Sequence, residues 1–200
     1  MADSYVFLRL RGAGRDARDL LERLRERTLP AWSAEGLRCW GIWQGLFGVG
    51  SNELLVMAGA PGDRPELDFR RALPDEAQVI DALPLLSTVR PQTIGRLPAE
   101  GVYVFRFFDV RLADCDAIVA LSQEAWETFE DTDRYVARPE GLFRARGDDA
   151  AEGRMLLVTW YDGLSSWEIS RNPAPEALDN FRRRRALTAG TIAYAARLVT

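Results

Sequence analysis

The triplet Tyr5-Val6-Phe7 occurs a second time as Tyr103-Val104-Phe105, and this recurrence decides the predicted fold. Three further segments recur in the same order along the chain: Gly45-Leu46-Phe47 as 141–143, Leu54-Leu55-Val56 as 156–158, and Arg96-Leu97 as 197–198. The four offsets are 98, 96, 102 and 101 residues. Ordered matches at nearly one offset are typical of an internal duplication, so we interpret the chain as two copies of one unit.

The first copy shows the residue patterns of alternating strands and helices. Apolar and aromatic residues alternate near the start, as in a strand, and the spacing then changes to that of a helix. A turn rich in Gly, Ser and Asn joins the next two apolar runs, which indicates a hairpin. The predicted elements are a strand at 4–11, a helix at 15–33, strands at 37–47 and 52–60, a helix within 65–84, and a strand at 86–96.

The second copy repeats this order after a short joint at 97–101. Strands are predicted at 102–109, 134–146, 154–162 and 190–199, and helices at 113–130 and 176–188. A βαββαβ unit is the ferredoxin-like arrangement, with helices on one face of each sheet. Two such units bury their other faces by packing sheet to sheet and closing a barrel. The predicted fold class is therefore α+β: two fused βαββαβ ferredoxin-like repeats, residues 1–97 and 102–200, that form one pseudo-dimeric α/β barrel.

The composition excludes several kinds of chemistry. The chain has no histidine, and its 26 basic residues are all arginine. Without histidine there is no Ser-His-Asp or Cys-His nucleophile and no usual zinc or haem ligand. Without lysine there is neither a Schiff base nor a P-loop lysine. Acid–base chemistry would therefore depend on Asp, Glu, Tyr, Cys or water. We expect no cofactor and no metal.

The charge pattern argues against a nucleic-acid partner. The net charge is −4, whereas nucleic-acid binding needs a basic field. One basic run, residues 182–185, lies on a predicted helix, where four consecutive side chains spread around the axis. We interpret this run as a solvated, ion-paired helix face, with a phosphate or partner site as the alternative. The acidic clusters near 127–133 and 148–152 lack EF-hand spacing and are interpreted as solvated too.

The sequence also predicts where the protein resides. No apolar run is long enough to cross a bilayer, and the N-terminal residues do not resemble a signal peptide. Two cysteines, Cys39 and Cys115, exclude a disulfide framework. We expect a cytoplasmic protein without a membrane partner, either a monomeric pseudo-dimer or a homodimer. The arginine-rich, lysine-free composition is typical of a GC-rich bacterial genome.

One segment resembles a known family. The stretch from Gly45-Leu46-Phe47 through Ser51-Asn52-Glu53-Leu54-Leu55-Val56-Met57 resembles the NIPSNAP hairpin, in which a Gly-turn-Asn-Glu segment leads into an apolar strand. The tandem layout is also similar to that family and to the wider dimeric α/β-barrel superfamily. The superfamily includes cofactor-independent monooxygenases, muconolactone-isomerase-like proteins and haem-handling proteins. In the second copy, Asp148-Asp149 and Gly153-Arg154 replace the Gly-Asn-Glu turn. The resemblance implies a fold and a pocket rather than a reaction.

Differences between the two copies indicate candidate functional residues. On the first strand, Leu8 corresponds to Arg106, which shares a face with Val104 and Phe108. An arginine among apolar neighbours needs a partner, because a buried unpaired charge is unfavourable. We interpret Arg106 either as an anion clamp, with Asp109 nearby, or as a strand-end side chain that reaches water.

A carboxylate on the second strand is the other polar candidate. By the triplet alignment, Gln44 corresponds to Glu140 and Ile42 to Arg138. A glutamate in an apolar pocket has a raised pKa and can act as a general base. The alternative is a solvent-facing Glu140 paired with Arg138.

Aromatic residues provide candidate pocket walls. On the third strand Ala58 and Gly59 are predicted to correspond to Trp160 and Tyr161, so one copy has space where the other has rings. Core complementation is the alternative. Strand alternation places Trp40 and Trp43 on opposite faces of one strand. Trp126 faces the sheet from a helix, where ligand pockets of this architecture lie.

These residues combine into one site hypothesis in the second copy. The candidate catalytic residues are Arg106, Glu140, Asp109 and Tyr161, and the candidate ligand-binding residues are Trp126, Trp160, Trp43 and Tyr103. The resemblance implies a cofactor-independent enzyme, monooxygenase- or isomerase-like, that acts on an aromatic or polyketide-like small molecule. Two alternatives remain: a non-catalytic NIPSNAP-type ligand- or protein-binding module, and a haem or tetrapyrrole binder without a histidine ligand.

Overall fold

The computed structural model describes residues 2–65, 68–98, 100–147, 151–172 and 175–199. The first half contributes strands β1 (Ser4–Arg11), β2 (Arg38–Phe47), β3 (Glu53–Ala60) and β4 (Gln78–Ser87). A helical segment connects β1 to β2 and consists of α1 (Arg18–Arg23), a π-helical turn η1 (Leu24–Thr28) and α2 (Leu29–Ala34). The helix predicted at 15–33 is thus present.

The second half contributes four more strands and most of the remaining helices. Its strands are β5 (Val102–Arg111), β6 (Ala137–Ala145), β7 (Glu152–Tyr161) and β8 (Thr188–Leu198). Its helices are the short 3-10 turn η2 (Leu112–Asp114), α3 (Cys115–Glu130), α4 (Leu164–Ile169) and α5 (Pro175–Ala186). Among the described residues no helix is long and apolar enough to span a membrane.

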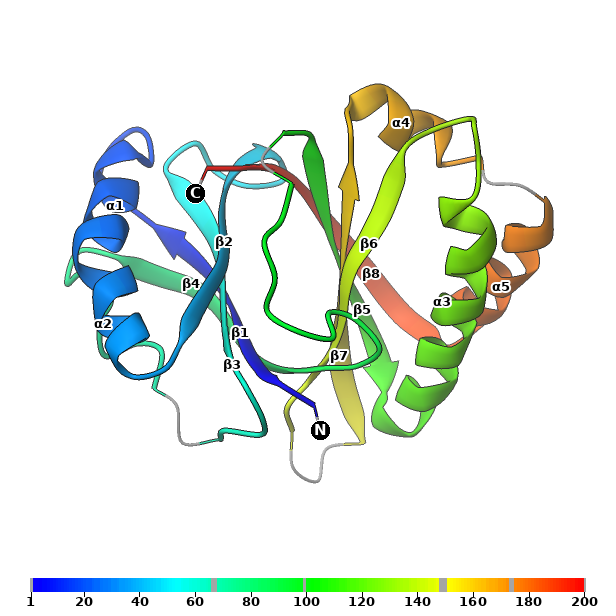
Figure 1. Cartoon of the computed structure of the whole chain (residues 1–200), viewed down its shortest axis with the longest axis horizontal. Coiled ribbons are helices and arrows are strands. Elements are labelled where there is room, and N and C mark those ends of the chain that lie inside the picture. The colour runs from blue at the N-terminus through cyan, green and yellow to red at the C-terminus, as the bar shows by residue number, and fades with distance from the viewer. Residues whose placement is uncertain (1, 66–67, 99, 148–150, 173–174, 200) are drawn as a thin grey trace.

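All eight strands form one closed antiparallel barrel in the order β1-β3-β2-β8-β5-β7-β6-β4. Each half therefore supplies a four-stranded sheet, and the halves join where β2 pairs with β8 and β4 pairs with β6. Figure 1 shows α1 and α2 on one outer side of the strands and α3 and α5 on the opposite side. This is the α+β, ferredoxin-like arrangement that the sequence predicts.

Aromatic side chains fill the interior of the barrel. Phe7 packs on Phe105 and Phe107 with ring centroids 6.0 and 5.0 Å apart, and Trp43 packs on Phe105 at 4.9 Å. Tilted and edge-to-face ring pairs at these distances are favourable. The interior is a packed core in which both halves interlock, and it is not a ligand channel.

Two predictions about the first half are wrong. No helix forms among the described residues of 65–84; residues 68–77 make turns instead, and β4 begins at Gln78. The closing strand predicted at 86–96 therefore lies earlier, at 78–87, and residues 88–98 connect the halves. Prolines at 65 and 74 interrupt the apolar spacing that a helix would need.

The strand pairing also corrects the predicted correspondence between the halves. Gly59 lies opposite Tyr5, and Trp160 lies opposite Tyr103, so Trp160 takes the place of Gly59 rather than of Ala58. On the same register Tyr161 takes the place of Ala60. The third-strand alignment was therefore shifted by one residue, which exchanges the two faces of a strand.

The second-strand alignment was shifted further. Both β2 and β6 contain a bulge, at Trp40 and at Glu140, so Glu140 takes the place of Trp40 rather than of Gln44. Arg138 likewise takes the place of Arg38, not of Ile42. The match between residues 45–47 and 141–143 misled the alignment because an unequal hairpin follows; the turn with Asp148 and Asp149 lies outside the described residues.

Candidate functional site

A cavity of about 730 Å³ lies in the second half, between the outer face of the sheet and the helices. Strands β5, β7 and β8 form its floor, and α3, α5 and the end of α4 form its walls. The volume is within the range of small-molecule sites. The lining residues are Val104, Arg106, Phe108, Trp126, Phe129, Pro139, Leu157, Thr159, Tyr161, Ser170, Arg171, Leu178, Phe181, Arg182, Arg184, Arg185, Thr188, Thr191 and Ala193.

Five of the lining residues are arginines, and no lining residue is acidic. Arg106 comes from β5, Arg171 follows α4, and Arg182, Arg184 and Arg185 come from α5. Among the described residues, none of these five forms an ion pair, although nine other arginines of the chain pair with a carboxylate. The cavity is therefore strongly positive and lacks an internal counter-charge.

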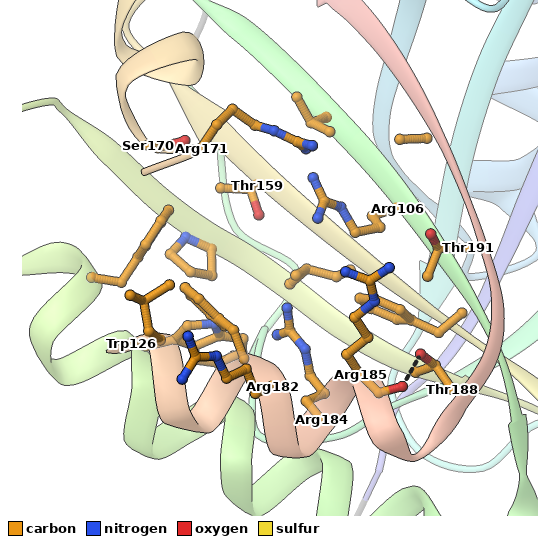
Figure 2. A pocket seen from close by; sticks show the side chains of 18 of the residues that line it. Arg106, Trp126, Thr159, Ser170, Arg171, Arg182, Arg184, Arg185, Thr188 and Thr191 are labelled. Carbon is orange, nitrogen blue, oxygen red and sulfur yellow. Dashed lines mark hydrogen bonds between the residues drawn. The ribbon is translucent and has the colours of Figure 1, made fainter. Parts of the chain in front are cut away.

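Arg106 rises from the middle of β5 into this space (Figure 2). Its neighbours on the outer face, Val104 and Phe108, are buried, so its stem is embedded in apolar surroundings. Burial lowers the pKa of Arg106, and the positive charge of Arg171 lowers it as well. No hydrogen bond from its guanidinium is present within the described part of the chain, and the group is free to bind an anion.

Arg184 is the most deeply buried of the five, with 8% of its surface exposed. Its guanidinium lies over the rings of Phe108 and Phe181, 5.1 and 5.0 Å from their centroids. It donates one long hydrogen bond, of 3.3 Å, to Ser122 Oγ. Burial, followed by the charge of Arg106, lowers the pKa of Arg184 to about 10. Aromatic faces offset only part of the desolvation of a cation, so an anion in the cavity would stabilise this residue.

Tyr161 is a buried phenol beside the arginines. It lies at the end of β7, and 5% of its surface is exposed. Burial raises the pKa of Tyr161, whereas a hydrogen bond with Ser170 and the charges of Arg106, Arg171 and Arg184 act in the opposite direction. It is thus a neutral proton donor at neutral pH, placed among cations.

Aromatic residues form the α3 side of the cavity. Trp126 and Phe129 lie on one face of α3, and Phe129 packs on Phe181 of α5 with ring centroids 6.3 Å apart. Arg90 stacks on Trp126 at 5.0 Å and is held by an ion pair with Glu130 at 2.6 Å. This wall is therefore fixed before a ligand binds, and it can pack against a flat apolar body.

The structure brings three of the predicted site residues together. Arg106, Tyr161 and Trp126 all line the cavity, which lies in the second half between sheet and helices. Sequence analysis missed Arg171, Arg184 and Arg185. The basic run at 182–185 could have indicated Arg184 and Arg185, because a helix that packs on a sheet turns part of such a run towards the sheet.

Glu140 and Asp109 lie elsewhere. The bulge in β6 turns Glu140 towards Tyr103 and away from the cavity lining, and its carboxylate accepts a 2.8 Å hydrogen bond from Arg138. Burial raises the pKa of Glu140, and Arg138 opposes this shift. Asp109 pairs with Arg154 at 2.9 Å on the surface. The structure therefore does not place either carboxylate beside Arg106.

The other predicted ligand-binding residues belong to the barrel. Trp43 and Tyr103 are fully buried in the barrel interior, and Trp160 packs against the same cluster. Tyr103 donates a hydrogen bond of 2.6 Å to the carbonyl of Pro98, and Trp160 donates one of 2.6 Å to that of Glu100. Trp40 and Trp43 both face the interior, contrary to the alternation expected, because the bulge adds one residue between them.

The lining residues are a poor fit to an iron tetrapyrrole. Haem iron needs an axial His, Cys, Met or Tyr ligand, and among the described lining residues Tyr161 is the single side chain of these types. Burial raises the pKa of that phenol and so opposes the phenolate form that binds iron. Within the described part of the chain, no group of three Cys, Asp or Glu residues could hold a metal ion.

Comparisons with known proteins support the fold. No protein-family model matches the chain, and no curated protein matches it. Among solved structures, a proposed monooxygenase from Lactobacillus acidophilus NCFM is similar over 100% of this chain and 95% of its own, with a TM-score of 0.63 and 9% identity. An anthrone oxidase-like protein is similar over 98% and 92%, with a TM-score of 0.59 and 14% identity.

A third similar structure is a mutant of chlorite dismutase from Candidatus Nitrospira defluvii. It matches over 99% of this chain and 91% of its own, with a TM-score of 0.63 and 11% identity. At such identities the likeness shows the fold alone. The comparisons thus define the fold, which is ferredoxin-like, and the function has to be argued from the site.

Proposed function

We propose that the chain binds a small aromatic anion in the outer cavity of its second half and acts on it as a cofactor-independent enzyme of monooxygenase- or isomerase-like type. The observation that carries this proposal is the set of five arginines without a carboxylate partner, facing an aromatic wall. Small-molecule sites combine an apolar wall with a few convergent polar groups in this way. Two structurally similar proteins, a proposed monooxygenase and an anthrone oxidase-like protein, are consistent with an aromatic, polyketide-like substrate.

The chemistry that this chain can supply is stabilisation of negative charge. Arg106 and Arg184 are held in a partly dry cavity, where a cation stabilises an oxyanion more strongly than in water. Tyr161 is the lining group positioned to donate a proton to that oxyanion. Glu140, Asp109, Trp43, Tyr103 and Trp160 have no part in this proposal, because none of them lines the cavity.

We also infer that residues 1–97 and 102–200 are copies of one unit. Both sheets have the same strand order, and both second strands carry a bulge at the same place. In each half a ring covers a glycine two residues before it, Trp43 over Gly41 and Phe143 over Gly141, where a Cβ would come within 2.5 Å. Membership of the NIPSNAP family in particular stays a prediction.

A binding experiment tests the location of the site. Isothermal titration calorimetry with 2-naphthoate is expected to show binding that weakens at least tenfold in Thr159→Phe, because the added ring fills the cavity floor. Asp109→Asn, on the surface, is the matched control and should bind as the wild type does. Equal binding by wild type and Thr159→Phe would contradict the proposed site.

A turnover experiment separates an enzyme from a binding module. With 9-anthrone, an aromatic ketone whose enolate is an aromatic anion, we expect oxygen uptake or isomerisation above the uncatalysed rate and its loss in Arg106→Met. Binding of 2-naphthoate without turnover of any enolisable aromatic substrate would favour the non-catalytic alternative.

A further inference from the structure

We propose that the ligand of the cavity carries two negative charges, as a dicarboxylate or a phosphate monoester does, at one end of its aromatic body. This inference rests on the proposed function, since it specifies the charge and the orientation of the ligand in that same site. It goes beyond that function because a single anionic group would satisfy the proposal above.

The number of cations in the cavity favours a ligand with two negative charges. The charge of Arg106 acts on Arg184, and burial lowers the pKa of both guanidinium groups. Arg171 also acts on Arg106, so at least three positive charges meet in one space. A single carboxylate there would leave most of this repulsion in place, whereas a dianion offsets two of the charges.

The directions of the arginine side chains also favour a ligand with two negative charges. Figure 2 shows the guanidinium groups of Arg106, Arg171, Arg184 and Arg185 pointing into the same space from β5, from the end of α4 and from α5. Each guanidinium offers a planar fork of donors that matches one oxyanion group. Several forks around one space provide more donors than one carboxylate can accept.

The apolar part of the cavity lining indicates how the ligand is oriented. Trp126 lies on the α3 side in Figure 2, across the cavity from Arg171 and Thr191. Thr159, Thr188 and Thr191 add hydroxyl groups to the lining of the cavity. A ligand with both charges at one end therefore places its ring against Trp126 and its charges between β5, β8 and α5.

An arginine cluster elsewhere in the chain is paired with a buried carboxylate, unlike the arginines of the cavity. In the first half, Glu53 is 1% exposed and bridges Arg9 and Arg11, with nitrogen–oxygen distances of 2.6 Å. The same chain therefore supplies a buried carboxylate as the counter-charge of these two arginines. Within the described residues the cavity arginines lack one, which leaves that role to a ligand.

The test uses one naphthalene body with different charges. Titrations with 2-naphthol, 2-naphthoate, 2,3-naphthalenedicarboxylate and 2-naphthyl phosphate measure Kd at two salt concentrations. We expect at least one of the two dianions to bind at least tenfold more tightly than 2-naphthoate, and its log Kd to rise with log salt about twice as steeply. The stronger of the two dianions identifies the dicarboxylate or the phosphate as the preferred source of charge.

Two variants complete the test. Arg171→Met should remove most of the gain of the dianion and change the Kd of 2-naphthoate less, while Asp109→Asn should leave every Kd unchanged. If 2-naphthoate binds in the cavity but neither dianion binds more tightly, the inference is overturned and the proposed function stands. If no naphthyl compound binds, both fail. A dianion gain that persists in the Arg106→Met/Arg184→Met double variant would also overturn the inference.

Discussion

The space between sheet and helices is packed with apolar side chains in the first half of this molecule, whereas in the second half it contains a cavity. In the first half, Leu8 of β1 is fully buried among the side chains of α1, α2 and β3. At the matching place in the second half, Arg106 of β5 enters a cavity of about 730 Å³. The same scaffold thus makes a packed core on one side and a cavity on the other, depending on which side chains meet there.

The two halves also treat arginine differently. Arg9 and Arg11 share the buried carboxylate of Glu53, which also accepts a hydrogen bond of 3.1 Å from the amide of Gly50. Among the described residues the cavity arginines have no such partner. The first half therefore pairs these two arginines internally, whereas the arginines that line the cavity of the second half lack a carboxylate partner within the described residues. The following substitutions test this difference.

Exchanging Leu8 and Arg106, which occupy matching places in the two halves, should change the free energy of unfolding the most. Leu8→Arg places a charge in a filled apolar layer, and we expect the free energy of unfolding to fall by about 4 kcal/mol or more. Arg106→Leu, the matched exchange, should leave stability unchanged or raise it by about 1 kcal/mol, because it removes an unpaired charge. Urea denaturation of both variants measures this; equal losses would contradict the comparison.

Removing the buried carboxylate of the first half should have the next largest effect. We expect Glu53→Gln to lower the free energy of unfolding by about 2 kcal/mol at pH 7, because Arg9 and Arg11 lose their partner. Burial alone would raise the pKa of Glu53, but the hydrogen bonds from Arg11, Gly50 and Arg9 together outweigh it and lower this pKa.

The lowered pKa of Glu53 determines how the stability of the protein depends on pH. Because the pKa of Glu53 is lower in the folded state, its contribution is complete above about pH 4.3, the value for an unperturbed glutamate. It is lost as the pH falls through the folded pKa. The stability difference between wild type and Glu53→Gln should therefore shrink on acidification, as urea titrations between pH 7 and pH 3 would show. A constant difference would mean that the carboxylate charge is not responsible.

Removing a cavity arginine should affect binding rather than stability. We expect Arg106→Met to raise the Kd of 2-naphthoate at least tenfold, or about 1.4 kcal/mol, because the anion loses a desolvated cation. The thermal midpoint should stay the same or rise. Calorimetric titration and thermal denaturation of one preparation distinguish this result from misfolding. Unchanged affinity would place the anion away from β5.

The exposed pair of the second half should show the smallest effect. The side chains of Asp109 and Arg154 are 52% and 40% exposed, and such pairs contribute about 0.5 kcal/mol or less. Asp109→Asn should therefore change neither stability nor binding measurably, and the same assays check both. A large loss of binding would return Asp109 to the site.

The predictions for the second half were more accurate than those for the first. The helix predicted at 113–130 is α3 at Cys115–Glu130, because its apolar stripe packs on the sheet. The stretch 65–84 also had apolar residues, but its described part forms turns and a strand. For the site, Arg106 and Trp126 were found from their unusual places on an apolar strand and helix. Arg171 had no such signal, since it follows a helix that the sequence did not predict.

The sequence by itself determined the strand periodicity, the four strands of each half and the absence of histidine and lysine, because these depend on the chain and its local chemistry. The tertiary structure alone decided which side chains share a space. A bulge at Glu140 turned that carboxylate away from Arg106, and the packing of α5 on α3 brought Arg184 and Arg185 to the cavity. A one-residue bulge reverses the face of a strand, and helix rotation selects among consecutive arginines. Neither is visible in local spacing, since both are set by contacts between residues far apart in the chain.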